Sequence, residues 1–94
     1  MVEIELVFAE GNRGLAWFDK GVKTYEEQVK PNYTGINDKI TLKFPEHIEQ
    51  VTSSFVQGLF DEWIHSNGYQ WIQENVIIET SGDYLREAIW DRIY

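Results

Sequence analysis

Residues 40–60, ITLKFPEHIEQVTSSFVQGLF, contain a strand pattern, a polar connection and a helix start in direct succession. Apolar and polar residues alternate over the first five positions, which predicts a strand with one buried face. Pro45 then opens a short polar connection, because proline has no N–H to donate to a continuing strand. Three consecutive hydroxyls, Thr52, Ser53 and Ser54, come directly before an apolar run. This order predicts a strand that leads into an amphipathic helix.

The apolar run after the hydroxyls has helical spacing. Its positions follow an i, i+1, i+4, i+5, i+8, i+9 pattern, which places them on one side of a helix. Asn67-Gly68 then supplies a left-handed stop, and residues 69–75 are expected to form one short further helical turn. The apolar stripe consists of Phe55, Val56, Leu59, Phe60, Trp63 and Ile64.

Strand and helix patterns alternate along the rest of the chain. Alternating apolar residues predict a strand over residues 2–8, and helical spacing predicts a helix over residues 15–29 that ends before Pro31. Gly21 lies in the middle of this helix, where glycine costs roughly 1 kcal/mol relative to alanine. The apolar residues 76–79 predict a third strand that is more fully buried.

A last helix follows Thr80 and Ser81, either of which can cap it, and apolar residues at 85, 88, 89 and 93 form its stripe. The order β-α-β-α-β-α favours parallel strands joined by right-handed crossovers. We therefore expect one domain over residues 1–94, a two-layer α/β sandwich whose helices lie mainly on one face of the sheet.

Composition excludes several functions. The 94 residues include 16 acidic and 8 basic side chains, a net charge of −8, which repels phosphate backbones and anionic lipids. We therefore expect no direct binding to nucleic acid or membrane. There is no cysteine for disulfides or thiolate metal sites. Because the N-terminus lacks the pattern of a secretory signal and no stretch approaches ~20 apolar residues, we expect a cytoplasmic protein.

The order of elements over residues 38–66 resembles the STAS domain of anti-sigma factor antagonists, and more closely the small bacterial STAS-like domains of unknown function. In that group an LDF-type strand end is followed by an SSSF-type run that opens a helix with an LF pair. Here residues 42–44 stand for LDF, residues 52–55 stand for SSSF, and Leu59-Phe60 supply the pair. The chain departs from the acidic residues usual in the group at three positions: Lys43, Gln57 and Gly58.

The resemblance implies a regulatory switch. In the antagonists that the chain resembles, a serine at the start of this helix is phosphorylated by a kinase of the histidine-kinase-like ATPase class. By position the equivalent is Ser54, with Ser53 as the second candidate. A phosphate there would gain from the free N–H groups and positive end of the helix, and it would add a charge of about −1.5 to −2. The alternative is that Thr52 and Ser53 only cap the helix, which is worth about 1 kcal/mol.

We expect a regulatory protein–protein interaction module without catalytic activity or cofactor. Its partner would be a histidine-kinase-like ATPase or the effector that this enzyme controls. The alternative is a small acidic inhibitor, encoded by a phage or mobile element, that acts as a decoy for a nucleic-acid-binding host defence protein. Contact residues are expected at the start of the second helix and, offset from the stripe, on the last helix: Thr52, Ser53, Ser54, Phe55, Gln57, Asp61, Trp90 and Tyr94.

The two histidines are the remaining candidates for chemistry. Asp61 precedes His65 by four residues, and one such pair is a weak metal signal. A catalytic serine at the hydroxyls would need an imidazole within reach, but His65 is about 16 Å further along the same helix. The other, His47, lies in the polar connection. The sequence therefore predicts surface histidines, no metal site and no enzyme.

Overall fold

Three parallel strands form the main sheet of the computed structural model, which describes residues 2–33 and 39–93. The middle strand is β3 (Ile40–Lys43), with β1 (Val2–Glu5) on one side and β5 (Val76–Glu79) on the other. Because parallel strands cannot be joined by tight turns, each step to the next strand crosses over through a helix. The predicted α/β class with a parallel sheet is confirmed.

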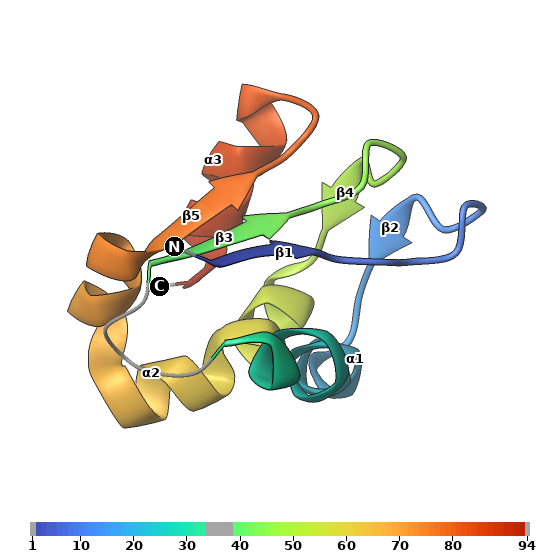
Figure 1. Ribbon diagram of the computed structural model, residues 1–94. Coiled ribbons are helices and arrows are strands. Elements are labelled where there is room, and N and C mark those ends of the chain that lie inside the picture. The colour runs from blue at the N-terminus through green and yellow to red at the C-terminus, as the bar shows by residue number, and fades with distance from the viewer. Residues whose placement is uncertain (1, 34–38, 94) are drawn as a thin grey trace.

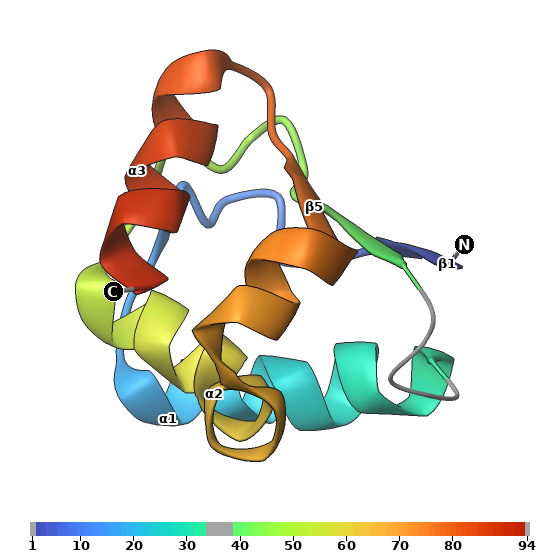
Figure 2. The same cartoon turned by 90° about the vertical axis from the view of Figure 1, so that its left-hand side faces the viewer.

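The three helices of the described residues lie on one side of this sheet (Figures 1 and 2). The first, α1 (Phe18–Thr24), follows β1, while α2 (Ser53–Asn75) joins β3 to β5 and α3 (Asp83–Ile93) follows β5. Apolar faces of strands and helices meet in one core. Its largest fully buried side chains are Trp63, Tyr25, Phe55, Phe60, Leu15, Ile40, Leu42, Ile48, Leu59, Ile72, Ile78 and Ile89.

The opposite face of the sheet is open to solvent. Glu3, Glu5 and Glu79 are exposed there, and Ile77 is 45% exposed. Lys43, on the middle strand, has its Nζ 3.1 Å from the Glu3 carboxylate and 3.7 Å from the Glu79 carboxylate. The hydrogen bond and charge of Glu3, followed by the charge of Glu79, raise the pKa of the Lys43 amine. The prediction of a more fully buried third strand is therefore wrong, because Ile77 and Glu79 of β5 are exposed on this face.

A second, two-stranded sheet is present that the sequence pattern does not predict. In it β2 (Gly14–Leu15) pairs in parallel with β4 (Gln50–Val51), and the Thr52 N–H donates to the Leu15 carbonyl at 2.9 Å. The helix predicted from residue 15 therefore begins only at Phe18, because the Leu15 backbone belongs to this sheet. The polar connection likewise ends in a strand.

The main sheet's first strand, β1, is shorter than the strand predicted over residues 2–8. Leu6 still donates its N–H to the Lys43 carbonyl of β3 at 2.9 Å, whereas the backbone of Val7, which points to the outer edge of β1, pairs with a side chain. Gln28 accepts from the Val7 N–H at 2.7 Å and donates to the Val7 carbonyl at 2.9 Å. This closes part of the β1 edge to pairing with another chain.

Helices α1 and α2 cross in backbone contact at two glycines, Gly21 and Gly58. A Cβ on Gly21 would overlap the Phe55 carbonyl oxygen and come within 2.7 Å of the Leu59 nitrogen. A Cβ on Gly58 would overlap the Phe18 carbonyl oxygen. Because these neighbours are backbone atoms, they cannot rotate away. The close packing of α1 and α2 therefore offsets the loss of helix stability caused by Gly21. Gly58 allows the same close packing from the side of α2.

The long helix α2 is broken at the predicted left-handed stop. Gly68 has φ 85° and ψ 165°, outside the helical range, so helical stretches lie on either side of it. The short helical segment predicted over residues 69–75 is the second stretch. Helix α1 is followed without interruption by a π-helical turn (Tyr25–Val29) and a 3₁₀ turn (Lys30–Asn32).

Replacing Gly21 by alanine is expected to lower the free energy of unfolding by at least about 2 kcal/mol, because the new methyl group forces the two backbones apart. Gly11→Ala is the matched control, since a Cβ there meets no atom within 4 Å. Its effect should stay below about 1 kcal/mol. Urea unfolding followed by tryptophan fluorescence measures both variants. Equal midpoints would show that the helices can separate without cost.

Candidate functional site

The first turn of α2 carries the three hydroxyls, and Thr52 is its N-cap. Thr52 has an extended backbone, its Oγ1 accepts from the Phe55 N–H at 3.3 Å, and its carbonyl accepts from the Val56 N–H at 3.1 Å. Of the two predicted caps, Thr52 therefore caps the helix, whereas Ser53 is the first helical residue. Capping accounts for one hydroxyl and leaves two.

Ser53 and Ser54 are both exposed on this first turn. The Ser54 Oγ lies 3.1 Å from the Thr52 Oγ1, whereas Ser53 lines an adjacent cavity. The first N–H groups of a helix have no partner within the helix, and they favour a negative group nearby. Both serines are thus accessible at a place where a phosphate would be stabilised.

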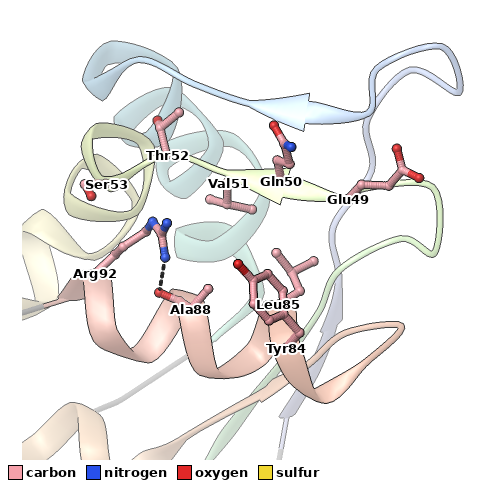
Figure 3. A pocket seen from close by; sticks show the side chains of 9 residues that line it. All are labelled: Glu49, Gln50, Val51, Thr52, Ser53, Tyr84, Leu85, Ala88 and Arg92. Atoms are coloured by element: carbon pink, nitrogen blue, oxygen red, sulfur yellow. Dashed lines mark hydrogen bonds between the residues drawn. The ribbon is translucent and has the colours of Figure 1, made fainter.

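A cavity of about 690 Å³, here called the groove, lies between β4 and α3 beside the start of α2 (Figure 3). Figure 3 shows β2 and α3 on opposite sides of β4. The groove therefore follows the edge of β4 that does not pair with β2. It is lined by Glu49, Gln50, Val51, Thr52, Ser53, Tyr84, Leu85, Ala88 and Arg92.

The two ends of the groove differ in charge. Arg92 lies at the end near Ser53, and Glu49 lies at the other end, near Tyr84 (Figure 3). The Arg92 Nη1 donates to the Ala88 carbonyl at 3.0 Å, which orients the guanidinium. Among the described residues no carboxylate forms an ion pair with Arg92. Its positive charge therefore adds to the positive end of α2.

Two exposed aromatic residues, Trp17 and Phe18, stand at the start of α1, shortly after β2, which pairs with the edge of β4 that is away from the groove. They are here called the aromatic pair, and they are 74% and 42% exposed. One residue, Ala16, separates them from β2, whose Leu15 carbonyl accepts from the Thr52 N–H, and the Phe18 carbonyl lies against Gly58 of α2. The hydroxyls therefore lie between the aromatic pair and the groove.

Trp17 has a backbone conformation that L-residues rarely adopt. Its φ is 80° and its ψ is 132°, and within residues 2–33 and 39–93 no other residue except glycine has positive φ. Such conformations cost of order 1–3 kcal/mol. Trp17 precedes α1 without a side-chain capping hydrogen bond, and its ring is mostly exposed. Neither capping nor burial compensates this strain.

The contact residues predicted from sequence lie only partly at the surface. Phe55 is 0% exposed, so its side chain belongs to the core and not to a contact surface, contrary to the prediction. Its place on the apolar stripe turns it inward. Gln57 is exposed, and Asp61 and Trp90 are half-buried. Tyr94 lies outside the described residues.

Sequence reasoning missed several residues around the hydroxyls. Tyr84, 84% exposed, and Arg92 line the groove, and Trp17 heads the aromatic pair. The sequence held a signal for Trp17 and Tyr84. Each stands outside the apolar stripe of the adjoining helix and directly precedes a residue of that stripe. For Arg92 the signal was its spacing of four residues from Ala88, which puts both on one helical face.

The two histidines have different surroundings. His65 is exposed, with its Nδ1 2.9 Å from the Asp61 carbonyl and 3.3 Å from the Asp61 carboxylate. His47 is partly buried, contrary to the surface position predicted, and its Nε2 makes no hydrogen bond in the described structure. No cluster of three or more potential metal ligands occurs among the residues described.

A hydrogen-bond chain links the segment after α1 to α2. The Trp63 Nε1 donates to the Tyr33 hydroxyl at 2.9 Å, and the Tyr33 and Tyr25 hydroxyls are 2.8 Å apart. Tyr25 donates to the Glu62 carboxylate at 2.7 Å, so the Tyr33 proton points to the Tyr25 oxygen. The Trp63 ring packs edge-on against both tyrosine rings, with centroids 5.4 and 5.6 Å apart.

Burial raises the pKa of the Tyr25 hydroxyl far above its usual value of about 10, and the hydrogen bonds with Tyr33 and Glu62 raise it further. Tyr25 therefore stays protonated and donates to Glu62 at neutral pH. Because the members of this chain are satisfied by one another, we interpret it as a structural link between the two segments.

In comparisons with protein-family models, with curated proteins and with solved structures, no match to the chain was found. Within the described ranges, no helix combines the length and the apolar character needed to cross a membrane. The hydroxyls, the groove and the aromatic pair are therefore the features on which a functional assignment rests.

Wild-type stability should fall above pH ~10, because the unfolded chain loses the Tyr25 proton there while the folded chain keeps it. This group contributes a decline of about 1.4 kcal/mol per pH unit, which should be absent in Tyr25→Phe. The variant should also lose about 1 kcal/mol at neutral pH with its hydrogen bonds. Urea unfolding across the alkaline range measures the slopes, and exposed Tyr84→Phe is the control. Parallel curves for wild type and Tyr25→Phe would contradict the assignment.

Trp17→Gly should raise the free energy of unfolding by about 1 kcal/mol, because glycine adopts positive φ without strain. Trp17→Ala removes the same ring but keeps the unfavourable conformation, so it should give no such gain. Thermal and urea unfolding of the two variants separate the backbone effect from the side-chain effect. A glycine variant less stable than the alanine variant would show that Trp17 is not strained.

Proposed function

We propose that the chain is a non-catalytic regulatory module that binds another protein through the start of α2 and the surfaces on either side of it. The observation that carries this proposal is the Trp17 ring, which is 74% exposed although its backbone is strained. Strain without compensation within the chain is concentrated at functional sites. A STAS-like relationship, drawn from residues 38–66, and a cytoplasmic location belong to the same proposal.

The residue types around the hydroxyls support a protein partner. Tryptophan, tyrosine and arginine are enriched among the residues that contribute most to protein interfaces. Trp17 lies on one side of the hydroxyls, and Tyr84 and Arg92 lie on the other, in the groove. The two aromatic rings would bury a large apolar area on binding, while each has only two side-chain torsions to immobilise.

Phosphorylation of Ser54, or of Ser53, would switch this binding. Both serines are exposed and lie in the first turn of α2, where free N–H groups favour a phosphate. The added negative charge would stand between the aromatic pair and the groove and would repel an acidic partner surface. By the STAS resemblance, the partner is a histidine-kinase-like ATPase or the effector that it controls.

The proposal is tested by quantitative affinity capture from the native host lysate with four baits: wild type, Trp17→Ala, Ile77→Ser and Ser54→Asp. A specific partner should be retained by wild type and by Ile77→Ser, which changes an exposed apolar residue on the open sheet face. Trp17→Ala should retain at least about tenfold less, as is usual for an interface anchor. Partners lost with Ile77→Ser and kept with Trp17→Ala would place the interface on the sheet.

With Ser54→Ala added as a fifth bait, Ser54→Asp should bind less than Ser54→Ala. An acidic residue in the first helical turn stabilises the helix by about 0.3–1 kcal/mol, so the loss would not come from unfolding. Equal capture by both serine variants would exclude the switch. Affinity for a partner at a packed interface should change little with salt. A steep loss would instead indicate the acidic-decoy function.

A further inference from the structure

We infer that the groove between β4 and α3 binds an extended peptide segment of the partner, which pairs with the edge of β4 and places a carboxylate beside Arg92. This inference rests on the proposed function, because it names the kind of chain that the module binds. Among the described residues, no backbone group pairs with the free edge of β4 and no carboxylate pairs with Arg92.

Strand β4 turns one backbone edge toward the groove. The N–H groups of Gln50 and Thr52 point toward β2, where they donate to the carbonyls of Arg13 at 3.2 Å and Leu15 at 2.9 Å. Successive residues of a strand direct their backbone groups to opposite sides, so the N–H and C=O of Val51 point away from β2. In Figure 3 that side faces α3. An extended chain placed there can accept from the Val51 N–H and donate to the Val51 carbonyl, which is the mode of strand addition.

The groove also has room for such a chain. Its volume of about 690 Å³ falls within the roughly 300–1,000 Å³ of pockets that hold ligands. Opposite β4, α3 lines the groove with the side chains of Leu85 and the small Ala88, between Tyr84 and Arg92 (Figure 3). The Tyr84 ring, 84% exposed, stands at one end and can cover a bound segment. The small residue and the free ring make α3 a suitable second wall.

Charge selects the chemistry of the bound segment. Arg92 lies at the Ser53 end of the groove and, among the described residues, has no carboxylate partner, although the chain as a whole has a net charge of −8. Its guanidinium has five N–H donors, and the bond to the Ala88 carbonyl uses one of them. The remaining donors match a carboxylate in geometry and charge. Glu49, at the other end, disfavours a second acidic group there.

The probe is a peptide obtained by phage display, with the full chain as the target. Two libraries of random short peptides are used, one with the peptide at a free C-terminus and one with the peptide at an internal position. The enriched peptide is synthesised with a fluorescent label, and its affinity is measured by anisotropy. The expected sequences carry a carboxylate at one end. Comparison of the free and amidated C-terminus then decides whether that carboxylate is the chain end or an acidic side chain.

Two groove variants and two matched controls test the location. Ala88→Phe fills the groove and Arg92→Gln removes its positive charge. Each variant should lower the affinity for the peptide by at least about tenfold. Glu87→Phe and Arg86→Gln make the same kinds of change at exposed positions of α3 that do not line the groove. They should alter affinity by less than about twofold. Hydrogen exchange of the Val51 amide should slow in the complex.

Equal affinity of wild type, Ala88→Phe and Arg92→Gln would overturn the inference, and so would failure of the selection to enrich any peptide. Peptides whose affinity falls in Trp17→Ala but not in Ala88→Phe would bind at the aromatic pair. In that case the proposed function stands and the assignment to the groove is wrong. Peptides that depend on Ala88, together with cellular capture that does not depend on Trp17, would support the groove and contradict the proposed anchor.

Discussion

The backbone contact between Gly21 and Gly58 is the constraint on which the rest of the structure depends. A sheet of three strands is only about 10 Å wide, whereas two packed helices normally have their axes 8–10 Å apart. Because α1, α2 and α3 all cover one face of this narrow sheet, at least one pair must approach unusually closely. The two glycines allow α1 and α2 to do so, since neither has a side chain at the crossing.

The same crossing positions the candidate site. It fixes the Phe18 carbonyl against Gly58, and the pairing of β2 with β4 brings Trp17 to the start of α2 from the other direction. On the opposite side, α3 forms the groove with Arg92 at its end. Lys43 is paired with carboxylates on the open sheet face, whereas no carboxylate of the described residues pairs with Arg92 at the site.

Local sequence patterns predicted the main elements well and the second sheet not at all. Alternation over residues 40–44 and 76–79, helical spacing after the hydroxyls and the left-handed stop at Gly68 each depend on a few neighbouring residues. The pairing of Gly14–Leu15 with Gln50–Val51 involves two residues from each segment, which is too short for any periodicity. The exposed face of β5 was also beyond prediction, because it depends on which layers cover the sheet.

What the sequence by itself determined is the class of fold, the capped start of α2 and the position of the hydroxyls, because capping and amphipathic periodicity are local properties. Only the tertiary structure decided which side chains surround those hydroxyls. Phe55 is turned into the core by the stripe to which it belongs, while Trp17 and Tyr84 stand outside their stripes and remain exposed. The groove exists because β4 and α3, which are distant in sequence, meet beside α2, and no local pattern carries that long-range information.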